Sequence, residues 1–150
     1  MGLKVRSGSF EDGQEIPRRH GYKNENVSPP LSISGTPEGA QSLAMVMDDP
    51  DAMAPAGKVW VHWLLWNVDP ATTEVPEGTI PEKSVEGTTD FGETGYGGPA
   101  PPDKRHTYIF KVYALDARLS LDGGSTKSEL EGAMQGHVLA EARLTGTYAP

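Results

Sequence analysis

Several ionisable and polar side chains lie in or next to the most apolar segments of this chain, and they are of types that can bind a ligand or transfer a proton. They are Asp49, Asp51, His62, His106 and Tyr108. An ionisable group at the end of a buried strand costs free energy unless it has a partner or a role. The pattern therefore predicts a small polar pocket at one edge of a β core.

Three runs have the composition of buried strands. Residues 43–47 are five apolar residues in a row between Gly- and Pro-containing stretches, which favours a short buried strand over a helix. Residues 59–68 and 106–115 each alternate between two faces. In the run 59–68 this alternation puts His62 on the same face as Trp66. Because both faces of that run are mostly apolar, we expect a central strand covered on both sides.

One helix is predicted, over residues 128–144. Thr126 and Glu129 have the spacing of a capping box just before it. Apolar residues recur along it at helical spacing, at Leu130, Met134, Val138 and Ala142. A last strand is expected over 144–148. Residues 69–103 are rich in Pro, Gly, Thr and acidic residues and are expected to form a long irregular segment of functional importance.

Length and composition limit the class of protein. The 150 residues suit a single domain spanning 1–150, and 18 Gly with 13 Pro favour turns and short strands. With no cysteine, disulfides and thiolate chemistry are excluded. The net charge of −8 argues against nucleic acid as a partner. No apolar stretch is long enough for a transmembrane helix and no secretory signal is visible, so we expect a cytoplasmic protein.

Motif searches leave one enzymatic alternative open. The chain has no Gly-x-Ser-x-Gly elbow, and its glycine-rich stretches 95–100 and 123–128 lack the strand–loop–helix context of a nucleotide site. Two histidines and two aspartates, at 49, 51, 62 and 106, have the donor types of a two-His carboxylate metal site. Their spacing matches no compact metal motif, so a metal-dependent enzyme is the weakest of the functional alternatives.

Several sequence blocks, taken in order, resemble the phosphatidylethanolamine-binding protein family, which includes the Raf kinase inhibitor protein. The blocks are Ser-Pro-Pro-Leu at 28–31, Asp-Pro-Asp at 49–51, Val-His-Trp at 61–63, Gly-Tyr-Gly-Gly-Pro-Ala-Pro-Pro at 95–102 and His-Thr-Tyr-Ile-Phe at 106–110. The resemblance extends over essentially the whole chain, and the compact length is similar to the bacterial and archaeal branch. It implies a mainly β fold, with a large central antiparallel sheet, a smaller second sheet and a few short helices.

The resemblance also implies a function and a site. The function is binding of a small anion, such as phosphate or a phosphoethanolamine headgroup, by a regulatory protein that modulates a kinase; the alternative is inhibition of a serine protease through a surface loop. No enzymatic activity and no cofactor are expected, and the oligomeric state stays open between a monomer and a homodimer. The residues implied in ligand binding are Asp49, Asp51, Trp60, His62, Gly98, Pro99, His106 and Tyr108.

Simple electrostatics assigns roles within this set. We expect His62 and His106 to donate directly to the anion, with Asp49 orienting one of the rings and Asp51 holding the adjacent loop. Backbone N–H groups near Gly98 would add donors. The family usually has a glycine-containing turn before the second histidine, whereas this chain has Asp-Lys-Arg at 103–105, which would supply local positive charge.

Overall fold

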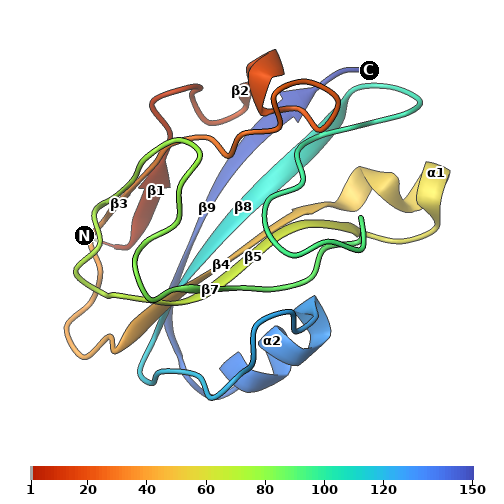
Figure 1. Cartoon of the computed structure of the whole chain (residues 1–150). Coiled ribbons are helices and arrows are strands. Elements are labelled where there is room, and N and C mark those ends of the chain that lie inside the picture. Colours follow the sequence, from red (N-terminus) through yellow and green to blue (C-terminus); the bar gives the residue numbers. More distant parts are fainter. Residues whose placement is uncertain (1) are drawn as a thin grey trace.

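The larger of two β-sheets has six strands in the order β2-β9-β8-β4-β5-β7 (Figure 1). The computed structural model describes residues 2–150. The strands are β2 (Gln14–Glu15), β4 (Ser42–Asp49), β5 (Trp60–Val68), β7 (Val85–Glu86), β8 (His106–Leu115) and β9 (Val138–Tyr148). Neighbouring strands are antiparallel except β2, which pairs with β9 in parallel. The sheet is therefore mixed at one edge, where a fully antiparallel sheet was expected.

A smaller sheet and a helix cover the two faces of the large sheet. The small sheet has three strands in the order β1-β3-β6, formed by β1 (Lys4–Arg6), β3 (Leu31–Ser34) and β6 (Glu74–Val75). Helix α2 (Lys127–Met134) lies on the other side (Figure 1). The mainly β architecture with a large and a smaller sheet is confirmed.

Strand β4 shows why the centre of the sheet is so apolar. All eight of its residues are buried, because alternate side chains enter different cores. Met45 and Met47 belong to the core under the small sheet, whereas Ala44 and Val46 pack with Leu130 of α2. The expectation of a central strand covered on both sides, made for the run 59–68, is confirmed for β5, since eight of its nine residues are buried.

A β-bulge interrupts this alternation at His62. Met47 pairs with Trp63 and Asp48 pairs with Val61, so His62 is an extra residue without a partner in β4. Val61 consequently packs in the core beneath α2, and the His62 ring lies edge-on to Tyr108, 5.1 Å away between ring centroids. The prediction that His62 shares a face with Trp66 is wrong, because strict alternation fails at a bulge.

The predicted helix over 128–144 is wrong in its second half. Helix α2 ends at Met134, Gly136 adopts a left-handed φ of +83°, and strand β9 begins at Val138. The capping box is present, because Thr126 and Glu129 bond each other's backbone. Beyond the glycine, pairing with β8 along ten registered positions outweighs a local helical spacing.

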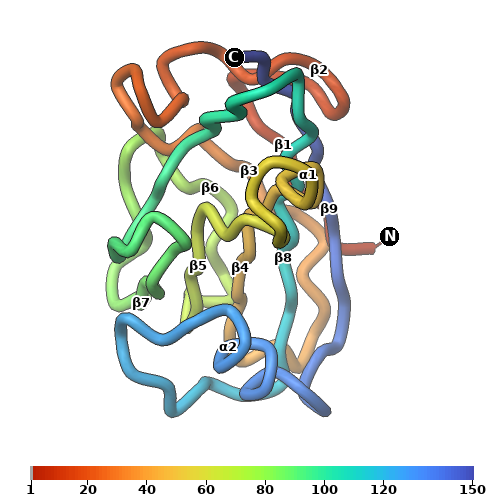
Figure 2. Tube along the Cα trace, turned by 90° about the vertical axis from the view of Figure 1, so that its right-hand side faces the viewer, coloured from red at the N-terminus to blue at the C-terminus, as the bar shows by residue number. Residues whose placement is uncertain are grey.

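The long segment 69–103 is fastened to the large sheet. It carries β6 and β7, and Asp90 N and Gly97 N donate to the carbonyl oxygens of Val61 and His62, at 3.1 and 2.8 Å. Figure 2 shows its end crossing the same end of the molecule as the N-terminal segment around residue 20, and there Tyr22 N donates to Pro99 O. No helix within residues 2–150 is long and apolar enough to cross a membrane.

Candidate functional site

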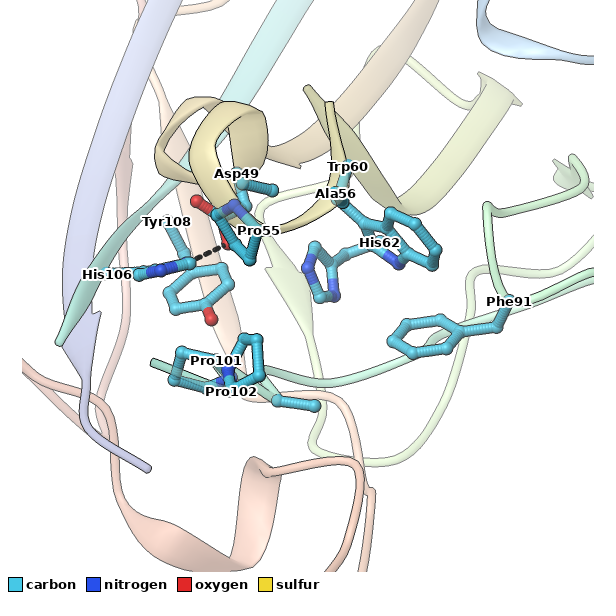
Figure 3. A pocket seen from close by; sticks show the side chains of 12 residues that line it. Asp49, Pro55, Ala56, Trp60, His62, Phe91, Pro101, Pro102, His106 and Tyr108 are labelled. Atoms are coloured by element: carbon cyan, nitrogen blue, oxygen red, sulfur yellow. Dashed lines mark hydrogen bonds and ion pairs between the residues drawn. The ribbon is translucent and has the colours of Figure 1, made fainter. Parts of the chain in front are cut away.

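A cavity of about 170 Å³ lies where one end each of β4, β5 and β8 meet (Figure 3). Short turns following β4 close one side of it, formed by a 3₁₀ turn (Pro50–Ala52) and helix α1 (Met53–Ala56). The residues that line the cavity are Asp49, Ala52, Pro55, Ala56, Trp60, His62, Phe91, Ala100, Pro101, Pro102, His106 and Tyr108. Its walls are thus mostly apolar or aromatic, with a few polar groups, which is the usual composition of a small-molecule site.

Asp49 joins the cavity to the turn that follows β4. It is buried, and its Oδ2 accepts a hydrogen bond of 2.6 Å from His106 Nδ1, while its Oδ1 accepts one of 2.9 Å from the backbone N–H of Asp51. The second bond caps the 3₁₀ turn. The structure therefore supports the predicted role of Asp49 as the residue that orients a histidine ring.

His106 uses both of its ring nitrogens within the chain. Besides the bond to Asp49, its Nε2 lies 2.7 Å from Oδ1 of Asp103. Burial opposes the charged form, but the hydrogen bonds to Asp49 and Asp103 outweigh it and raise the pKa of His106 above 6.5. This differs from the expectation of a direct anion donor, because neither nitrogen is free in this arrangement.

His62 lies in a different electrostatic environment. The bulge in β5 turns its ring into the cavity, and its Nδ1–H donates to the carbonyl of Gly97 at 2.6 Å. Burial lowers the pKa of His62 below 6.5, although the Gly97 carbonyl and the Asp49 carboxylate oppose this. The ring is therefore neutral near pH 7, and its Nε2 is the nitrogen that remains to accept a hydrogen bond from a ligand.

Two buried polar groups of the cavity wall have no hydrogen-bond partner among residues 2–150. They are the hydroxyl of Tyr108 and the indole Nε1 of Trp60. Figure 3 shows the Tyr108 hydroxyl pointing towards the side formed by Pro101 and Pro102. Burial, reinforced by the Asp49 carboxylate, raises the pKa of Tyr108, so the hydroxyl keeps its proton. Unpaired buried polar groups are rare in folded proteins and indicate a ligand or water that pairs with them.

Three residues of the predicted set support the wall without lining it. Asp51 Oδ2 accepts from the backbone N–H of Thr107 at 2.9 Å, which agrees with its predicted role of holding the loop. Gly98 N donates to Asn26 Oδ1 at 2.8 Å, so this amide is not the free ligand donor that we expected. Pro99 lines a neighbouring hollow beside Arg18.

Sequence reasoning missed several members of the wall. Phe91 comes from the middle of the segment 69–103 and packs edge-on against both Trp60 and His62. Pro55 and Ala56 come from α1. The signal that could have identified Phe91 is its position as one of two aromatic residues, with Tyr96, in an acidic, glycine-rich stretch. The expected positive charge before β8 is also partly used, because Arg105 pairs with Glu15 at 3.2 Å.

The four residues considered as metal ligands lie in different bonding environments. Among residues 2–150, no three His, Asp or Glu side chains are grouped so that they could hold an ion. Of the four residues considered, Asp51 is engaged with the backbone of Thr107, and His106 is bonded on both nitrogens.

The pKa values of the two cavity histidines are expected to lie on opposite sides of 6.5, that of His106 above it and that of His62 below it. Partner carboxylates favour the imidazolium at the first site, whereas burial disfavours it at the second. Measurement of the ring signals by NMR between about pH 5 and 9 checks this. His137, whose ring pairs with Asp116 on the surface, provides an exposed reference within the same spectra. A common midpoint for His62 and His106 would contradict the assigned environments.

Comparisons with known proteins give consistent results. The sequence profile described as phosphatidylethanolamine-binding protein matches residues 6–149. A UPF0098 protein of Methanothermobacter thermautotrophicus is 44% identical over 151 residues, which are 97% of this chain and 98% of that protein. A solved phosphatidylethanolamine-binding protein homologue from Chlamydia trachomatis has a TM-score of 0.93 at 39% identity, covering 98% of this chain and 97% of its own.

Two further solved structures extend the comparison. Escherichia coli YbcL, described as a member of the mammalian PEBP family, has a TM-score of 0.91 at 32% identity, covering 99% of this chain and 98% of its own. A carboxypeptidase Y inhibitor, solved with its cognate proteinase, has a TM-score of 0.57 at 17% identity, covering 97% of this chain and 81% of its own. At that identity the inhibitor shows a shared fold alone.

Proposed function

The chain belongs to the phosphatidylethanolamine-binding protein family, in its bacterial and archaeal branch, and from this premise we propose that it is a regulatory binding protein, not an enzyme. Its ligand is a small phosphate-type oxyanion, either free phosphate or the phosphate of a headgroup such as phosphoethanolamine. The observation that carries this proposal is the pair of buried, unpaired donors on Tyr108 and Trp60 in the wall of one cavity.

The hydrogen-bonding inventory favours a phosphate monoester or hydrogen phosphate. The Trp60 N–H can be satisfied only by an acceptor atom, and the Tyr108 hydroxyl can donate to one as well; phosphate oxygens supply such acceptors. Neutral His62 offers an acceptor at Nε2, and a singly protonated phosphate carries an O–H that can donate to it. One such ligand therefore satisfies all three groups, whereas a hydrocarbon would leave them unpaired.

The size of the cavity favours a headgroup over a whole lipid. Its volume of about 170 Å³ is below the roughly 300–1,000 Å³ typical of sites for drug-sized ligands. The absence of catalysis is part of the proposal.

The regulatory part of the proposal has one structural support. Met53 is 54% exposed on α1, the helix that supplies Pro55 and Ala56 to the cavity wall. This exposed apolar side chain gives a kinase partner a contact surface next to the cavity. The alternative, inhibition of a serine protease, is favoured only by the exposed Ile80 in segment 69–103.

An NMR titration of labelled protein with phosphoethanolamine tests the binding proposal. Saturable shifts are expected at His62, Tyr108 and the Trp60 indole N–H. Tyr108→Phe should weaken binding by about 10- to 100-fold, because it removes one hydrogen bond to a charged acceptor, and His62→Ala should weaken it further. Binding should also weaken as the pH rises through the second ionisation of the phosphate, because the dianion no longer carries the O–H that donates to the neutral His62 ring.

The matched control is His137→Ala, which removes a histidine outside the cavity wall. Its affinity should equal that of the wild type. Absence of shifts at about 10 mM ligand would reject the proposal. The same variants separate the alternative function, because inhibition of a serine protease that survives Tyr108→Phe and His62→Ala would assign that activity to a surface apart from the cavity.

A further inference from the structure

The positive charge that the cavity can offer to an anion is confined to one ring. The described lining residues include no lysine and no arginine. His62 is neutral because of its burial, so His106 is the cationic group in the wall. Whatever neutralises His106 therefore decides whether the cavity attracts or repels an oxyanion.

Two carboxylates of very different exposure hold this ring. The side chain of Asp49 is 4% exposed, whereas that of Asp103 is 37% exposed, and each lies within 2.7 Å of one ring nitrogen. A histidine can donate from both nitrogens only as the imidazolium. Asp49 is thus a fixed, buried partner, and Asp103 is a surface partner that can rotate into solvent.

We propose that Asp103 is an internal competitor for the ligand: its carboxylate occupies the anion position on His106 Nε2, and an oxyanion gains this donor only when Asp103 is displaced or neutralised. The inference rests on the proposed function and adds a residue that sets its specificity. An oxyanion that uses Nε2 must take the place of the Asp103 carboxylate, since that oxygen already lies 2.7 Å from the nitrogen.

The charges around His106 predict which ligands can displace the Asp103 carboxylate. With Asp103 in place, the group of Asp49, His106 and Asp103 carries a net charge of −1, because two carboxylates surround one imidazolium. A bare phosphate is repelled by this group. A zwitterion such as phosphoethanolamine is repelled less, since its ammonium can pair with the displaced Asp103 carboxylate. The chain therefore selects a phosphate that brings its own cation.

Affinity measurements on Asp103 variants test the proposal. Calorimetric titrations at about pH 6, where the imidazolium is favoured, compare inorganic phosphate with phosphoethanolamine on the wild type, Asp103→Asn and Asp103→Ala. Both variants should bind inorganic phosphate at least about tenfold more tightly than the wild type, because a like charge next to the ligand is removed. The gain for phosphoethanolamine should be clearly smaller.

Asp116→Asn is the matched control, since Asp116 is also an exposed aspartate bonded to a histidine, at 2.8 Å from His137. It should leave both affinities unchanged. A spectroscopic readout accompanies the titration: in the Asp103 variants, phosphate should shift the His106 Nε2–H signal. A merely structural role of Asp103 would not produce this shift.

The outcomes distinguish this inference from the proposed function. Equal phosphate affinity in the wild type and the Asp103 variants overturns the competitor role and leaves the binding function standing. An equal gain for both ligands overturns the selection for a zwitterion. Failure of both ligands to bind the wild type and both variants overturns the proposed function itself, and the inference with it.

Discussion

Asp49→Ala is expected to lower the free energy of unfolding by about 3–5 kcal/mol, the usual cost of breaking a buried ion pair by removing one partner. Asp49 and the ring of His106 are both buried, and their atoms lie 2.6 Å apart. The substitution also removes the cap on the backbone N–H of Asp51, which adds about 1 kcal/mol. Urea unfolding of the two proteins measures the difference.

The pH dependence of this loss has a definite sign. The pKa of His106 is raised in the folded protein, so the stability that its pair contributes is complete below 6.5, the ordinary value, and disappears as the pH rises through the folded value. The cost of Asp49→Ala should therefore be larger at about pH 5.5 than at about pH 9.

Asp116→Ala provides the control for this comparison. The Asp116–His137 pair is close to half exposed on both sides, and exposed pairs contribute no more than about 1 kcal/mol. A loss of under about 1 kcal/mol for Asp49→Ala, matching the surface pair, would show that the buried pair does not stabilise the turn and the cavity wall.

Strand periodicity was sufficient to predict the three central strands of the large sheet. The runs 43–47, 59–68 and 106–115 correspond to β4, β5 and β8, because long apolar alternation has few structural solutions. The predicted helix over 128–144 was wrong beyond Met134, because its spacing was read without knowledge of long-range strand pairing. Spacing in sequence cannot reveal that residues beyond Gly136 find a partner strand in β8, and long-range pairing decides between helix and strand there.

The sequence predicted which residues line the site better than it predicted the contacts that these residues make. Asp49, Trp60, His62, His106 and Tyr108 all line the cavity as expected. Their roles depend on features that leave no trace in a single sequence. The bulge that turns His62 inward is a matter of register between two strands, and the carboxylate on His106 Nε2 comes from a surface loop whose turn was expected to bring positive charge.

Gly98→Ala is expected to destabilise the protein by about 3 kcal/mol or more and to disturb the cavity wall, because the added methyl group meets backbone. A Cβ at this position would lie 2.0 Å from the carbonyl oxygen of His20 and 2.9 Å from the nitrogen of Tyr22. Because these are backbone atoms, the clash can be relieved only if the loop around Gly98 moves away from the segment 20–22. That separation would strain the bonds from Gly98 N to Asn26 and from Tyr22 N to Pro99, at 2.8 and 3.0 Å.

Gly132→Ala is the contrasting substitution. Gly132 lies within α2, where an added Cβ meets no atom within 4 Å, so alanine should stabilise the protein by about 0.5–1 kcal/mol through its helix propensity. Thermal and urea unfolding of the two variants, with phosphoethanolamine titrations of each, distinguish the steric clash at residue 98 from the general effect of replacing a glycine by alanine. If Gly98→Ala were as stable as the wild type and bound the ligand equally well, the loop could not be the rigid wall that holds His62 Nδ1 through the Gly97 carbonyl.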